Sequence, residues 1–88
     1  MRYRVFLHPR AREYLDALDD AVRERMKKKA EELAEHPKRG KPLKHSSFWS
    51  LRVGDHRVIY EIQRETTRIV ILFVGHRKDV YDDFSKLL

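Results

Sequence analysis

Basic side chains at alternating positions are the residues of this sequence best suited to chemistry. Arg52 and Arg57 lie on either side of a predicted tight turn, and Arg77 follows the apolar run 69–74. Tyr81 comes one helical turn after Arg77. Several cations that converge on one surface repel one another, and a bound polyanion relieves that repulsion. The pattern therefore predicts an anion-binding site.

Ordinary ion pairing is the alternative interpretation of these charges. Nearby acids that could pair with the arginines are Glu61, Asp79, Asp82 and Asp83. The lysine run 27–29 also has glutamates at helical spacing. That spacing favours a solvated, ion-paired helix face over a surface that docks on nucleic acid.

Residues 37–47 form a second group of cations. Pro37, Gly40 and Pro42 interrupt this segment, so we expect an irregular loop inside the domain with no helix or strand. The loop enters the predicted sheet beside the arginines. Its candidates for binding RNA are Lys38, Arg39, Lys41, Lys44 and His45.

Other kinds of chemistry find no support in the sequence. The chain has no cysteine, which excludes a disulfide, a thiolate zinc site and a cysteine nucleophile. Its five histidines include no i, i+4 pair and no His-Glu-x-x-His motif. The glycines stand alone, so no phosphate-binding loop is present. We therefore expect neither a metal ion nor another cofactor.

Length and composition predict one basic domain. The chain has 88 residues, of which 41% are hydrophobic and 39% charged, and a formal net charge of +6. This length suits a single domain, residues 1–88, with one core. The apolar run 69–74 is far shorter than the roughly 20 residues of a membrane span. The amino terminus is too charged for a signal peptide. We expect a soluble, cytoplasmic protein without a membrane partner.

The periodicity of apolar residues predicts the elements that position the arginines. A strand at residues 3–7 precedes two helices, whose apolar faces are Ala11, Tyr14, Leu15 and Leu18, then Val22, Met26, Ala30 and Leu33. Three strands at residues 49–53, 58–62 and 69–74 follow, with a short helix in the tail, residues 78–88. The order β-α-α-β-β-β plus a short helix predicts an α+β fold with an antiparallel sheet and a helical hairpin on one face.

Alternation within the strands predicts where the arginines point. Trp49, Leu51 and Val53 should face the helices, as should the alternate apolar residues of the next strand. Arg52 and Arg57 would then project together from the opposite, open face.

Two strand motifs resemble a known family. The segments LRVGDHRVIYEI (51–62) and VGHRKDVY (74–81) resemble the signature of the RelE/ParE toxin superfamily, and the resemblance extends over nearly the whole chain. It implies a toxin of a type II toxin–antitoxin system. RelE-like members are metal-independent endoribonucleases that cleave mRNA on the ribosome. ParE-like members inhibit DNA gyrase and do not use the nuclease residues.

The resemblance also implies roles for the site residues. In a RelE-like toxin Arg52 would grip the RNA, while Arg57 and Arg77 would stabilise the phosphate as the 2′-hydroxyl attacks it. Tyr81 would act as the general base. Ser50 stands where RelE-like toxins have a second lysine, a gap that Lys44 or His45 from the loop could fill.

The resemblance further implies a RelB-like antitoxin in a hetero-oligomeric complex, with the ribosome and mRNA as the other partners. Two alternatives stay open: a ParE-like gyrase inhibitor without nuclease activity, and a non-catalytic RNA-binding module.

Overall fold

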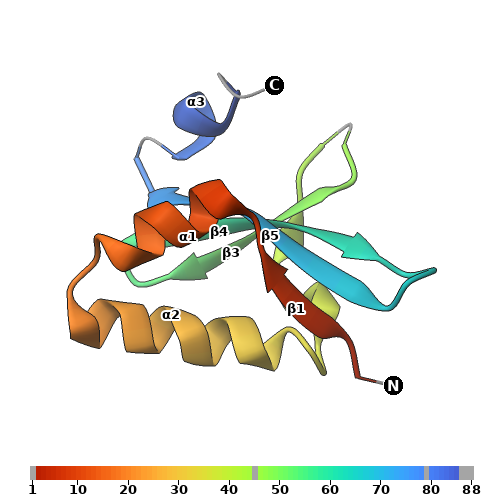
Figure 1. The fold of residues 1–88 in the computed structure, drawn as a ribbon. Coiled ribbons are helices and arrows are strands. Elements are labelled where there is room, and N and C mark those ends of the chain that lie inside the picture. Colours follow the sequence, from red (N-terminus) through yellow and green to blue (C-terminus); the bar gives the residue numbers. More distant parts are fainter. Residues whose placement is uncertain (1, 45, 79, 86–88) are drawn as a thin grey trace.

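A five-stranded sheet with the order β1-β5-β4-β3-β2 forms the centre of the molecule (Figure 1). The computed structural model describes residues 2–44, 46–78 and 80–85. The strands are β1 (Arg4–Leu7), β2 (Lys41–Pro42), β3 (Phe48–Val53), β4 (His56–Gln63) and β5 (Arg68–His76). The helices are α1 (Pro9–Asp16), α2 (Asp20–Glu32), the 3-10 helix η1 (Pro37–Arg39) and α3 (Val80–Ser85).

The predicted α+β class and the helical hairpin on one face are confirmed. Strands β3, β4 and β5 pair antiparallel as expected, and the unpredicted strand β2 pairs antiparallel with β3. Strand β1 instead pairs parallel with β5, with Arg4 opposite Arg68. The sheet is therefore mixed. Alternation of apolar residues could not reveal this, because side chains alternate between the two faces whatever the direction of the neighbouring strand.

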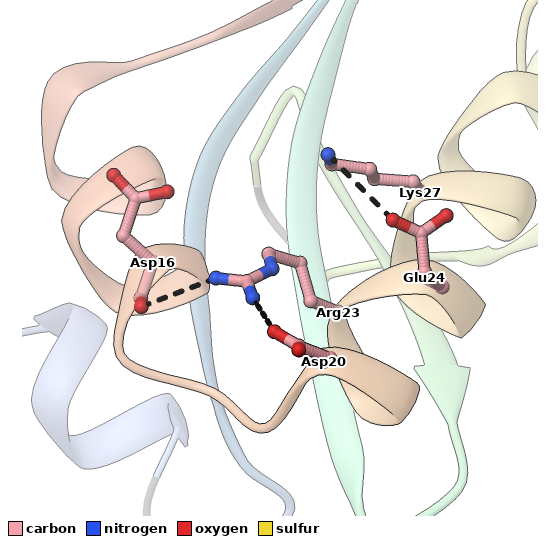
Figure 2. A network of polar contacts seen from close by, with 5 residues as sticks. All are labelled: Asp16, Asp20, Arg23, Glu24 and Lys27. Atoms are coloured by element: carbon pink, nitrogen blue, oxygen red, sulfur yellow. Dashed lines mark hydrogen bonds and ion pairs between the residues drawn. The ribbon is translucent and has the colours of Figure 1, made fainter.

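Local interactions fix the helical hairpin. His8 caps α1, since its Nδ1 accepts a hydrogen bond from the Arg10 amide at 3.2 Å, and Pro9 occupies the first turn. Figure 2 shows Arg23 of α2 donating to the carbonyl of Asp16 at 3.3 Å and pairing with Asp20. Arg23 thus ties the start of α2 to the end of α1.

The lysine run of α2 forms ion pairs, as its spacing indicated. Lys27 lies 3.9 Å from Glu24 (Figure 2), and Lys29 lies 3.6 Å from Glu32. Both pairs have i, i+3 spacing. The i, i+4 pairs that the sequence suggested, Glu24 with Lys28, Lys27 with Glu31 and Lys28 with Glu32, are not among the ion pairs of the described residues. In the described parts of the chain, no helix is long and apolar enough to cross a membrane.

The main core lies between the hairpin and the sheet. Leu51 and Val53 of β3 and Val58 of β4 point into it, as their alternation predicted. The helices supply Ala11, Leu15, Met26 and Leu33. The opposite face is only partly open, contrary to expectation, because α3 packs on it. Val80 and Phe84 of α3 bury Ile59, and the rings of Phe84 and Phe48 meet edge to face with centroids 5.3 Å apart.

The expectation of an irregular loop at residues 37–47 is wrong, since η1 and β2 lie within it. Tyr60 organises this segment. Its hydroxyl donates to the carbonyl of Pro37 at 2.6 Å and accepts from the amide of Gly40 at 3.2 Å. A Cβ at residue 40 would collide with the Ser50 carbonyl, so glycine is needed for this close approach.

Candidate functional site

The register of β3 and β4 places two of the predicted arginines side by side. Arg52 lies directly opposite Arg57, and the intervening turn uses Gly54 at φ 61°. Residues directly opposite each other in an antiparallel pair share a face, so both arginines lie on the α3 side of the sheet, as predicted. Arg52 donates through Nε to the Gly54 carbonyl at 3.0 Å.

Tyr81 reaches this face from α3. Its hydroxyl lies 3.1 Å from the Ser50 hydroxyl, which also accepts a hydrogen bond from Arg57 at 3.3 Å. The Arg57 guanidinium lies 6.0 Å from the centre of the Tyr81 ring. Ser50 is 2% exposed and Tyr81 is 42% exposed. Arg57, Ser50 and Tyr81 therefore form a connected cluster, which we call the tyrosine cluster, with the phenol open to solvent.

Close packing of α3 on β5 sets the position of Tyr81. Gly75 lies opposite Arg57 in the sheet, and a Cβ at residue 75 would lie 3.0 Å from a methyl group of Val80. The missing side chain lets Val80, which is fully buried, sit against the strand. Tyr81, the next residue, is thereby held above Arg57.

Arg77 follows β5 and lies beside the turn that joins β3 to β4. Its amide donates to the carbonyl of Asp55 at 2.8 Å, which ties the segment after β5 to the β3–β4 turn. Its side chain is exposed. The acids whose side chains are described form no ion pair with Arg52, Arg57 or Arg77.

Glu61, one of the four acids weighed as partners, instead accepts hydrogen bonds from Ser47 and Gln63. The alternative of ion pairing with Glu61 is therefore wrong. Asp79 and the side chains of Asp82 and Asp83 lie outside the described residues.

The structure separates the five cations of the basic segment. Lys41 lies opposite Ser50 on the edge strand β2, on the same face as the tyrosine cluster, and it is exposed. Arg39 is turned toward the hairpin, where it pairs with Glu32 of α2 at 3.4 Å. Lys38 and Lys44 are exposed, and His45 lies outside the described residues.

Two histidines lie next to the site, on the other side of the sheet. The rings of His56 and His76 are 5.9 Å apart, and His56 also contacts the ring of Tyr14 in α1. Within the described residues, no three His, Asp or Glu side chains gather into a group that could hold a metal ion.

Comparison with known proteins places the chain in a family. A family model described as "ParE toxin of type II toxin-antitoxin system, parDE" matches residues 5–81. The chain belongs to the RelE/ParE toxin superfamily. The resemblance of the two strand motifs is thereby confirmed. Toxin RelG of Mycobacterium tuberculosis is 43% identical to it over 53 residues, which span 57% of this chain and 61% of RelG.

Solved structures of RelE-type toxins share the fold of this RelE/ParE toxin. A chain in the toxin–antitoxin complex RelBE2 from Mycobacterium tuberculosis superposes with a TM-score of 0.81 at 34% identity, covering 88% of this chain and all of that one. A mutant of the E. coli toxin RelE in the free state gives a TM-score of 0.81 at 26% identity, covering 100% of this chain and 99% of that one.

Sequence reasoning proposed the arginines and Tyr81 as candidate site residues but treated Ser50 only as a missing lysine. The sequence did indicate that Ser50 lies on the face of the candidate site, because it is two residues from Arg52 in the same strand. Its two partners could not be inferred, since they depend on how α3 docks.

Proposed function

We propose that this toxin is a ribosome-dependent, metal-independent endoribonuclease that cleaves mRNA. The observation that carries the proposal is the tyrosine cluster: a solvent-accessible phenol hydrogen-bonded to Ser50, which also binds Arg57, on a face that includes Arg52 and Lys41. A phenol beside cations that form no ion pair with the described acids suits a reaction in which a proton leaves and negative charge develops on a phosphate.

In the proposed reaction the RNA 2′-hydroxyl attacks the adjacent phosphorus, and the bond to the 5′-oxygen of the next nucleotide breaks. The products are a 2′,3′-cyclic phosphate and a 5′-hydroxyl. Tyr81, in its ionised phenolate form, accepts the proton of the attacking hydroxyl and becomes a neutral phenol. Arg57 and Arg77 are proposed to donate hydrogen bonds to the phosphorane oxygens; in the alternative role, Arg77 gives a proton to the leaving 5′-oxygen.

Substrate binding is assigned to the cations around the cluster. Among the described residues, Arg52 donates one N–H to the Gly54 carbonyl, and its remaining donors are proposed to bind a phosphate. Lys41 extends the same positive surface across β2. Lys38, Lys44 and His45 are proposed to contact RNA further along the strand. The exposed site does not enclose its substrate, and the ribosome is therefore proposed to orient the mRNA.

A RelB-like antitoxin is the proposed regulatory partner. A cavity of about 190 Å³ opens between β1 and α2 and is lined mostly by apolar side chains, including Leu7, Met26 and Ile71. Phe6 and Leu7 of the adjacent edge strand are also exposed. An amphipathic, acidic antitoxin would match these apolar groups and the net charge of +6. The proposed complex is hetero-oligomeric and, because it acts on ribosomes, cytoplasmic.

The test is primer extension on a defined mRNA in a purified translation system. We expect ribosome-dependent cuts from the wild type, and losses of about 100-fold or more for Arg77→Ala and Tyr81→Phe. Arg2→Ala and Tyr14→Phe are matched controls, because Arg2 pairs with Glu35 and Tyr14 lies in α1 on the opposite face of the sheet. Cleavage that survives in Tyr81→Phe would remove Tyr81 from the reaction.

A ParE-like gyrase inhibitor is the second candidate, favoured by the match of the ParE family model to residues 5–81. It predicts no RNA cuts and loss of DNA supercoiling by purified gyrase. A well-folded wild type that inhibits gyrase and leaves mRNA intact would replace the nuclease proposal. A non-catalytic RNA-binding module would bind RNA with salt-dependent affinity but would neither cut it nor inhibit gyrase.

A further inference from the structure

Ser50 is an unusual residue for the interior of this molecule. In the described chain, the buried side chains other than Ser50 and Tyr60 are apolar. A buried hydroxyl is costly unless it is hydrogen-bonded. Ser50 satisfies this requirement entirely with residues of the tyrosine cluster, Arg57 of β4 and Tyr81 of α3.

The geometry gives the Ser50 hydroxyl a linking role. A serine hydroxyl offers one donor and two acceptor positions. One acceptor position is taken by Arg57 at 3.3 Å. The proton and the second acceptor position remain for Tyr81 at 3.1 Å, where either oxygen can be the donor. Ser50 can therefore keep this hydrogen bond whether the phenol carries its proton or has lost it.

Tyr81 needs the hydrogen bond to Ser50 because the packing of α3 fixes the backbone of this residue and not its phenol ring. The helix spans Val80–Ser85 and is anchored through Val80 and Phe84. Those anchors fix the backbone of Tyr81, while the residue as a whole stays 42% exposed. Within the described chain, the Ser50 hydroxyl is the only hydrogen-bond partner of the phenol oxygen.

A neutral residue at position 50 also suits Arg57. A cation there would repel the guanidinium, whereas the serine oxygen accepts one of its N–H groups and leaves the others for a phosphate. Positive charge beside position 50 comes instead from Lys41, which lies directly opposite Ser50 on the neighbouring strand β2.

We infer that Ser50 is a positioning residue, whose hydroxyl fixes the Tyr81 phenol relative to Arg57 for proton removal from the RNA. This inference rests on the proposed nuclease function. It assigns Ser50 no contact with the substrate. Loss of the hydroxyl should therefore slow the cleavage step and leave RNA binding unchanged.

The test compares single-turnover cleavage of ribosome-bound mRNA by the wild type, Ser50→Ala and Ser50→Thr. We expect Ser50→Ala to cut about 10- to 100-fold more slowly at saturation, with an unchanged half-saturating toxin concentration. Ser50→Thr keeps the hydroxyl and should recover most of the rate. Ser47→Ala is the matched control, since this serine is exposed and binds Glu61. Thermal unfolding verifies that each variant is folded.

Combination with Tyr81→Phe separates positioning from a general structural effect. If Ser50 acts through Tyr81, Ser50→Ala should cause almost no further loss in the Tyr81→Phe background. Two losses that multiply would overturn the inference, because Ser50 would then act independently of Tyr81.

The two proposals fail in different ways. A wild type that cuts mRNA, with Ser50→Ala equally active, overturns the role of Ser50 and leaves the nuclease standing. A folded wild type that cuts no mRNA overturns both proposals.

Discussion

Replacing Tyr60 with phenylalanine is expected to lower the free energy of unfolding by about 2 kcal/mol. The Tyr60 hydroxyl donates to the Pro37 carbonyl at 2.6 Å and accepts from the Gly40 amide at 3.2 Å. Phenylalanine leaves both backbone groups without this partner, at about 1–3 kcal/mol for each group that stays unsatisfied. Pro37 and Gly40 are half-buried, so water restores part of the loss, and about 1 kcal/mol applies to each.

Urea denaturation followed by fluorescence measures this change. Trp49 is the single tryptophan and its ring lies 6.4 Å from that of Tyr60, so it reports on this part of the core. In a domain of this size 2 kcal/mol corresponds to a fall in Tm of about 8–16 °C. Tyr14→Phe is the control, because no described residue hydrogen-bonds its hydroxyl. A change below about 0.5 kcal/mol in Tyr60→Phe would show that the hydroxyl does not hold η1 in place.

Three further outcomes are expected. Burial raises the pKa of Tyr60 above 10.0, against the lowering effect of the Gly40 hydrogen bond. The unfolded chain therefore loses this proton first, and the free energy of unfolding should fall as pH rises above about 10. Urea titrations across that range should show the fall in the wild type, and a smaller one in Tyr60→Phe. Gly40→Ala should cost about 1–3 kcal/mol by thermal unfolding, because the new methyl meets the Ser50 carbonyl and the Tyr60 hydroxyl. If Lys41 contacts a phosphate, Lys41→Gln should reduce the slope of log affinity against log salt for single-stranded RNA by about 0.7; an unchanged slope would exclude that contact.

The sequence was sufficient to place Arg52 and Arg57 on one face. Strand side chains alternate with a period of two, so the apolar residues that fill the core also decide where their neighbours point. Side-chain position along a strand is therefore a local property. Helices α1 and α2 could be predicted for the same reason, from apolar positions such as Ala11 and Leu15.

Contacts between distant segments could not be predicted in this way. The hydrogen bond of Ser50 with Tyr81 depends on the docking of α3 above Gly75, which alternation does not encode. The order in the segment 37–47 depends on the Tyr60 hydroxyl, a group that apolar periodicity treats simply as core. Both are tertiary effects that override local propensity.

The parallel pairing of β1 with β5 also sets when the toxin can form during synthesis. Arg4 pairs opposite Arg68, so β1 can join the sheet only after β5 has been synthesised. Such distant pairing slows folding, because a long loop must close before the contact contributes stability. A nascent chain that has not yet reached β5 carries Arg52 and Arg57 but lacks the strand that flanks β4 and the Tyr81 that follows it. On the proposed function, a chain still in synthesis would therefore lack a complete site for cleavage.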